Sequence, residues 1–204
     1  VVLTKGETIR ASCDDLSCMF YCLSQPEGAL KYNVVGRRWR GARLFDVGAA
    51  GGQIARPNDY YRFALKVQGM GDSNAVDIAT LAHVGLLNQF KCLPDECVLH
   101  FHDTVPASKT WTGVYIDDKL VSQQLPIADV NSNDYFDSVL VDRGQSAYAS
   151  ETGFTEAIEK RTRYRESFTA WGTDVLGRAG KAESPLAKRC LIASCCAAVI
   201  RQGR

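Results

Sequence analysis

The sequence lacks a long hydrophobic run and a visible signal peptide, and both absences argue against a membrane partner. Its longest apolar tract, Cys190 to Ile200, is about half as long as a helix that crosses a bilayer. Internal repeats and low-complexity tracts are also absent. With 46% apolar and 23% charged residues in 204, the chain is expected to fold as one globular domain, or as one domain and a small appendage. It begins at Val1 rather than Met, and we interpret it as a piece of a longer protein.

None of the eight cysteines forms a C-x-x-C pair. Several lie within apolar patterns, so we expect free, buried thiols in a reducing intracellular compartment, the cytoplasm or nucleus. One group stays open as a zinc site, because four sulfur and nitrogen ligands fall within a short segment. Its members are Cys92, Cys97, His100 and His102.

An excess of charge of either sign is also lacking, since the formal net charge is only +1. Global electrostatics therefore predicts no polyanion partner. The basic residues are nevertheless clustered, and such patches bind phosphates locally or simply form a solvated face. The clusters are Arg37, Arg38, Arg40 and Arg43; Lys160, Arg161, Arg163 and Arg165; and Lys181, Lys188, Arg189, Arg201 and Arg204.

The order of predicted elements is α+β. Ile9, Ala11, Cys13 and Asp15 alternate on one face of a predicted strand. Ser73 is a good N-cap for a helix that runs to about Phe90. The remaining predictions are a short helix at 16–24, a strand at 60–67, strand-like segments at 98–101 and 111–115, a polar loop at 129–144, a basic helix at 156–168, a strand at 169–176 and an amphipathic helix at 186–200.

The most informative stretch is Thr112 to Val121, in which Asp117 and Asp118 interrupt a strand-like pattern. Side chains alternate faces along a strand, so neighbouring carboxylates point at one spot only near a tight turn, and Tyr115–Asp118 is predicted to be a hairpin tip. Two anions held so close repel unless they share a cation, and Mg²⁺ is the natural candidate. The alternative is a solvated Asp-Asp turn.

A second stretch, Leu44 to Gly52, predicts a strand followed by an Asp-x-Gly-x-x-Gly-Gly loop. It resembles the cofactor loop of methyltransferases that use S-adenosylmethionine, which requires a helix directly after the glycines. Pro57 follows closely in this chain. A methyltransferase built on the loop from Asp46 to Gly52 therefore stays as an alternative function.

Three blocks in fixed order resemble the palm of a reverse transcriptase, the RNA-directed DNA polymerase of retroelements. The first is Asp15 with an aromatic residue, Phe20, five positions later. The second is the glycine turn and helix start at 68–75, and the third is the Tyr-Ile-Asp-Asp sequence at 115–118. Downstream, Lys160 resembles the lysine of a fourth block, and Ala170–Gly172 resembles the hairpin that grips the primer.

The resemblance implies an antiparallel, ferredoxin-like palm sheet with helices packed on one face. Residues 1–185 would form the palm, with truncated fingers and an insertion at 37–58, and residues 186–204 would begin the thumb. Asp15, Asp117 and Asp118 would hold two Mg²⁺ ions for nucleotidyl transfer. The implied partners are an RNA or DNA template-primer, gripped by Trp171 and Gly172, and deoxynucleoside triphosphates, contacted by Phe20, Met70, Gly71 and Lys160.

Two further alternatives share this fold. RNA-copying RNA polymerases have the same palm, but they usually carry a second aspartate where Phe20 stands and a Gly-Asp-Asp hairpin, so the residues present favour reverse transcription. The other alternative is a degenerate palm that is kept as a non-catalytic scaffold.

Overall fold

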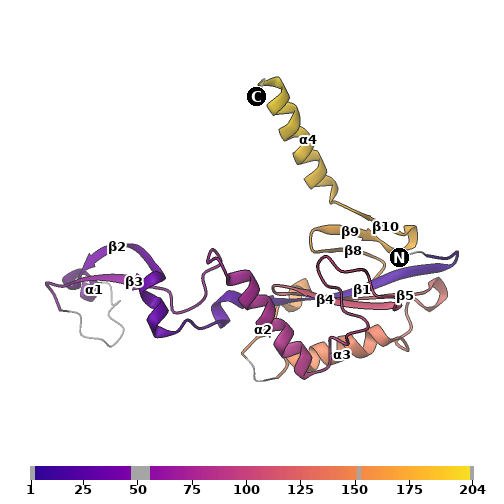
Figure 1. The fold of residues 1–204 in the computed structure, drawn as a ribbon, viewed down its shortest axis with the longest axis horizontal. Helices are drawn as coiled ribbons and strands as arrows, with labels where there is room; N and C mark the ends of the chain where they lie inside the picture. The colour runs from indigo at the N-terminus through magenta and orange to yellow at the C-terminus, as the bar shows by residue number, and fades with distance from the viewer. Residues whose placement is uncertain (1–2, 47–55, 151–152, 203–204) are drawn as a thin grey trace. The chain divides into compact units, whose positions relative to one another are not determined.

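The computed structural model describes residues 3–46, 56–150 and 153–202. The chain divides into two compact units (Figure 1). The first, here called the sheet unit, comprises Val1–Ser17 and Asp77–Arg204, and the second, the inserted unit, is Cys18–Val76. The insertion predicted at 37–58 therefore lies within the inserted unit, which interrupts the sheet unit in sequence.

The main sheet of the sheet unit is antiparallel and has the strand order β4-β5-β1-β6, with β7 also paired to β1. The central pair is β1 with β5, which stay in register from Glu7↔Pro126 to Asp15↔Asp118. The strands are β1 (Glu7–Ser17), β4 (Thr110–Tyr115), β5 (Asp118–Pro126), β6 (Thr155–Glu156) and β7 (Thr162–Arg165). The predicted α+β class is thus correct.

Two helices accompany this sheet, α2 (Ala75–Gln89) and α3 (Phe136–Tyr148). Leu140 and Val141 of α3 pack with Val121 of β5 in the buried core. His83 of α2 bonds to Tyr148 of α3, so the two helices are neighbours. The helix predicted from Ser73 to Phe90 is confirmed within two residues at each end.

The polar face of β1 is the more deeply buried one. Thr8, Arg10, Ser12 and Asp14 are at most 2% exposed, whereas Ile9, Cys13 and Asp15 on the other face are partly exposed. Arg10 makes four hydrogen bonds there. Its Nε and Nη2 donate to the two carboxylate oxygens of Asp137 at 2.8 Å, and its Nη1 donates to the carbonyls of Val130 and Ser132. This buried pair ties β1 to the start of α3.

A second sheet is formed by β8 (Ser167–Ala170), β9 (Thr173–Leu176) and β10 (Lys181–Glu183). The continuous strand predicted at 169–176 is wrong, because Trp171 and Gly172 have φ angles of 49° and 71° and turn the chain back. Gly177 follows β9 and lies against β1: a Cβ there would meet the Ile9 carbonyl oxygen at 1.9 Å.

Replacing Gly177 with alanine is therefore expected to lower the free energy of unfolding by about 1–3 kcal/mol, because two backbone segments would have to separate. Urea denaturation measures the change. Gly85→Ala in α2 is the matched control, since no atom lies within 4 Å of a Cβ there. Equal stability of the two variants would contradict the close approach.

The inserted unit contains an antiparallel pair of strands, β2 (Val34–Arg40) and β3 (Tyr60–Ala64), here called the β2–β3 hairpin. Two short helices precede β2, and a third lies between the two strands. These are the 3₁₀ turns η1 (Met19–Cys22) and η2 (Glu27–Tyr32) and the helix α1 (Gly41–Asp46). The strand predicted at 60–67 ends early, at Ala64. The short helix predicted at 16–24 is reduced to the 3₁₀ turn η1, because β1 continues to Ser17.

Helix α4 (Leu186–Arg201) confirms the helix predicted at 186–200, and all of its side chains are exposed. In the described ranges, no helix has the length and apolarity needed to cross a membrane. The eight cysteines are not joined in disulfides, as predicted, but burial is confirmed only for Cys92 and Cys97. Cys13 is half-buried and the other five are exposed.

Two predictions between β5 and β8 are wrong. Residues 129–144 were expected to be a loop, but α3 begins at Phe136, and its inward face includes Asp137 and Ser138 in addition to apolar residues. Residues 156–168 were expected to be helical, but they form the end of β6, the 3₁₀ turn η4 (Ile158–Lys160), β7 and the start of β8. In this segment Lys160, Arg161 and Arg163 form ion pairs with acidic residues of β1 and β6. Local helix propensity does not reveal such pairing.

Candidate metal centre

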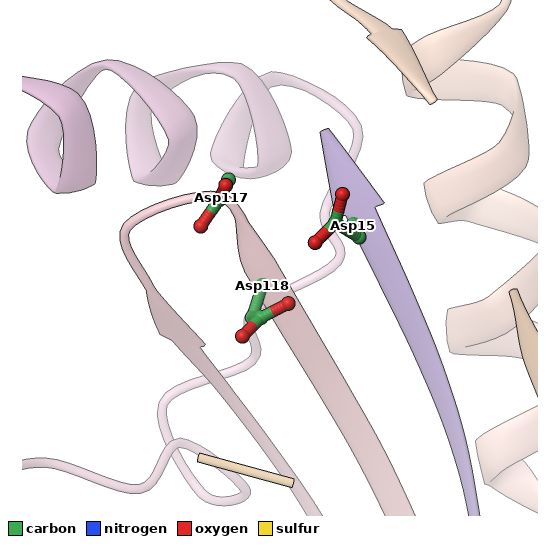
Figure 2. Close-up of side chains that lie close together, drawn as sticks. All are labelled: Asp15, Asp117 and Asp118. Carbon is green, nitrogen blue, oxygen red and sulfur yellow. The ribbon is translucent and has the colours of Figure 1, made fainter. Parts of the chain in front are cut away.

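Three carboxylates converge where β1 ends and β5 begins (Figure 2). Asp117 lies in the turn before β5, Asp118 is the first residue of β5, and Asp15 is paired with Asp118 across the sheet. One ligand oxygen from each lies within 4.8 Å of the others. The backbone N–H of Leu16 donates to the Asp117 carbonyl at 3.0 Å, which fixes the turn against β1. The predicted convergence of these aspartates is confirmed.

The turn that carries Asp117 is held from α2. Ile116 has φ = 57°, a conformation that costs a β-branched residue about 1–2 kcal/mol. Its N–H donates to the Thr80 hydroxyl at 3.2 Å, and its carbonyl accepts from His83 Nδ1 at 3.0 Å. His83 Nε2 then accepts from the Tyr148 hydroxyl at 2.8 Å. This chain of hydrogen bonds supports the strained turn and requires a neutral imidazole.

His83 should therefore make stability depend on pH. Burial lowers its pKa from 6.5 to about 4. Between about pH 6.5 and pH 4, His83 is protonated in the unfolded chain but neutral in the folded protein, so the free energy of unfolding falls as the pH falls. The loss attributable to His83 is about 3 kcal/mol. We expect His83→Gln, which does not titrate, to remove that part of the pH dependence in urea denaturation between pH 7 and 4.5. An unchanged slope would contradict this assignment.

The cluster holds more negative charge than its protein partners neutralise. Lys160 Nζ lies 2.8 Å from Asp15 Oδ1, and this lysine is the cationic side chain paired with the three carboxylates in the described part of the chain. Burial, followed by the charges of Asp117 and Asp15, raises the pKa of Asp118 to about 6. Burial and then Asp15 also raise the pKa of Asp117. A divalent cation would offset this repulsion, and hard carboxylate oxygens are the ligands that Mg²⁺ prefers.

A buried ionic network lies on the other face of the same two strands. Asp14 and Lys119 are partners in the sheet register, and Lys119 Nζ lies 3.8 Å from Asp14 Oδ2 and donates to the Leu140 carbonyl at 2.8 Å. Arg163 Nη1 lies 2.5 Å from Asp14 Oδ1. Burial raises the pKa of Asp14, an effect that Lys119 opposes. Strand alternation thus assigns Asp14 to the core and Asp15 to the cluster.

The turn predicted to grip the primer lies beside the cluster. A pocket of about 220 Å³ is lined by Asp118 and by both turn residues, Trp171 and Gly172. Gly113 of β4 makes room for the indole, because a Cβ at Gly113 would lie 2.6 Å from the ring of Trp171. The remaining lining residues are Cys13, Lys119, Leu120, Thr169 and Ala170.

The other predicted nucleotide-binding residues belong to the inserted unit. Phe20 lies in η1 and is half-buried, while Met70 is 72% exposed. Gly71 follows in a turn that Asp72 closes by accepting the N–H of Gly69 at 3.0 Å. The glycine turn predicted at 68–75 is therefore present, and Met70 is not a core residue.

The two alternative sites are the glycine loop from Asp46 to Gly52 and the group of four zinc ligands. Of the loop from Asp46 to Gly52, residues 47–52 lie outside the described residues, and Leu44–Asp46 belongs to helix α1 rather than to the predicted strand. The four proposed zinc ligands are not gathered: among the described residues, the aspartate cluster is the one group of three or more acidic, histidine or cysteine side chains placed to hold a metal.

Comparisons with known proteins add no family assignment. The chain matches no protein-family model, and a search of curated proteins finds no significant relative.

Proposed function

We propose that the sheet unit is the palm of an RNA-directed DNA polymerase that transfers deoxynucleotides to a primer. The observation that carries the proposal is the meeting of Asp15, Asp117 and Asp118, separated by about a hundred residues in sequence, with oxygens within 4.8 Å. The cluster sits on a strand end and a hairpin turn, where regular backbone positions it. Its unneutralised charge gives it a use for Mg²⁺.

The strand order supports a palm of the ferredoxin-like kind. Helix α2 lies between β1 and β4 in sequence, and α3 lies between β5 and β7. With the inserted β2–β3 pair and the short β6 set aside, the chain order is βαββαβ, and the order β4-β5-β1, with β6 and β7 both paired to β1, places the two central strands side by side. Their neighbouring ends carry Asp15 and Asp118, which is the arrangement that nucleotidyl transfer at a palm requires.

Each residue has a chemical role in this proposal. Asp15, Asp117 and Asp118 would hold two Mg²⁺ ions, which supply activation of the primer hydroxyl and charge neutralisation at the leaving pyrophosphate. Lys160 holds a proton beside Asp15 and would donate it, or its charge, to the departing phosphate. Trp171 and Gly172 would position the primer end beside Asp118. By the resemblance to reverse transcriptases, Phe20, Met70 and Gly71 would contact the incoming deoxynucleotide, and the ring of Phe20 would exclude a 2′-hydroxyl.

Primer extension tests the proposal directly. A version restored to full length should extend a DNA primer on an RNA template with deoxynucleotides and Mg²⁺, and EDTA should abolish the product. Preference for ribonucleotides would favour an RNA polymerase instead. Absence of extension under all these conditions, with Mg²⁺ binding retained, would favour the degenerate, non-catalytic palm.

A further inference from the structure

The inserted unit is far more basic than the rest of the chain. It contains eight basic and four acidic residues, so its formal charge is +4 although the whole chain carries only +1. The basic residues are Lys31, Arg37, Arg38, Arg40, Arg43, Arg56, Arg62 and Lys66, and the acidic ones are Glu27, Asp46, Asp59 and Asp72. The positive charge is concentrated around the β2–β3 hairpin.

These basic side chains are not neutralised internally. Every ion pair found among the described residues lies in the sheet unit. In the inserted unit, two of the arginines lie over aromatic rings instead. Arg37 lies 4.5 Å from the ring of Trp39, and Arg40 lies 5.7 Å from the ring of Tyr60 and donates to its hydroxyl at 3.2 Å. Their charges therefore remain available to an external anion.

The hairpin also exposes aromatic surface. It is a two-stranded sheet with no third strand among the described residues. Tyr60 is 60% exposed and Phe63 is 46% exposed, on opposite faces of β3. Arg62 shares the face of Tyr60, and Arg38 lies in the bulge opposite Arg62. Arginines beside exposed rings suit a chain of phosphates that carries planar bases.

We propose that the β2–β3 hairpin binds single-stranded nucleic acid without sequence preference. Arg38, Arg40 and Arg62 contact phosphates, and Tyr60 stacks on a base. A folded acidic protein would satisfy the charges but not the exposed rings, and a duplex offers no unstacked bases. The inference deepens the proposed function, in which the bound strand is the template, yet it rests on the hairpin alone. Binding without primer extension would refute the proposed function and uphold this one.

Fluorescence anisotropy with the full chain tests the inference. The probe is a labelled oligouridylate, titrated in EDTA between 50 and 200 mM salt so that the aspartate cluster takes no part. The double variant Arg38→Ala with Arg62→Ala removes two cations that make no hydrogen bond or ion pair within the described chain. It should weaken binding and reduce the slope of log K against log salt by about 1.4. Tyr60→Ala should weaken binding about 5- to 150-fold.

The matched control is Arg178→Ala, which removes one exposed arginine from the sheet unit. It should leave the oligouridylate affinity unchanged. The inference is overturned if the double variant binds as tightly as this control, or if the wild-type chain does not bind the probe. It is also overturned if a duplex of equal length or polyglutamate binds as tightly as the single strand, because stacking would then contribute nothing. Circular dichroism of each variant confirms folding.

Discussion

Asp117→Asn is expected to reduce primer extension about a thousandfold, since losing a metal ligand removes several kcal/mol of transition-state stabilisation. The amide keeps the size of the side chain but offers a poorer, uncharged ligand. Its effect on stability should have the opposite sign. The charge of Asp117 raises the pKa of Asp118, so removing that charge relieves repulsion in the metal-free protein.

The combination separates a role in catalysis from a role in folding. A structural aspartate would lose stability and activity together, whereas a metal ligand in a crowded cluster should lose activity at equal or higher stability. Asp142→Asn, an exposed residue of α3, is the control for the loss of a carboxylate charge. Full activity of Asp117→Asn in steady-state extension would refute the role assigned to Asp117.

Asp137→Ala is expected to lower the free energy of unfolding by about 3–5 kcal/mol, the cost of leaving a buried charge without its partner. Arg10 is fully buried, and two of its nitrogens donate only to Asp137. The loss is a large share of the roughly 5–15 kcal/mol that stabilises an ordinary domain. Equilibrium denaturation in urea measures it.

The control for this prediction is Asp142→Ala, on the exposed face of the same helix, which should change stability by less than about 0.5 kcal/mol. Similar stability of the two variants would show that Arg10 finds other acceptors, such as water, and that the pair does not join β1 to α3. A variant of Asp137 that is unfolded at room temperature would agree with the upper end of the expected range.

The parts of the fold that could be predicted are those with regular patterns. β1, α2 and the β4–β5 hairpin have clear periodicity, and the adjacent Asp117 and Asp118 marked the turn. α3 was missed because its buried face includes Asp137 and Ser138, which resemble loop residues until Arg10 supplies the partner. β7 was missed because its Arg163 pairs with Asp14, which is distant in sequence, as well as with Glu156.

The candidate site divides in the same way. Turn chemistry predicted that Asp117 and Asp118 lie together, but Asp15 and Lys160 were added to them only through the resemblance to polymerases. The network of Asp14, Lys119 and Arg163 left no signal in the sequence, since each charge alone is typical of a solvated surface. The role of His83 could not be predicted either, because it depends on hydrogen bonds with Ile116 and Tyr148 that the sequence does not indicate.

Calorimetric titration of the chain with Mg²⁺ tests most directly whether the three carboxylates form a metal centre. The account predicts saturable binding at pH 7.5 that is weakened at least about tenfold by Asn at position 15, 117 or 118. Asp142→Asn should bind Mg²⁺ as the wild-type chain does. Equal heats from the wild-type chain and from Asp15→Asn, Asp117→Asn and Asp118→Asn would contradict it.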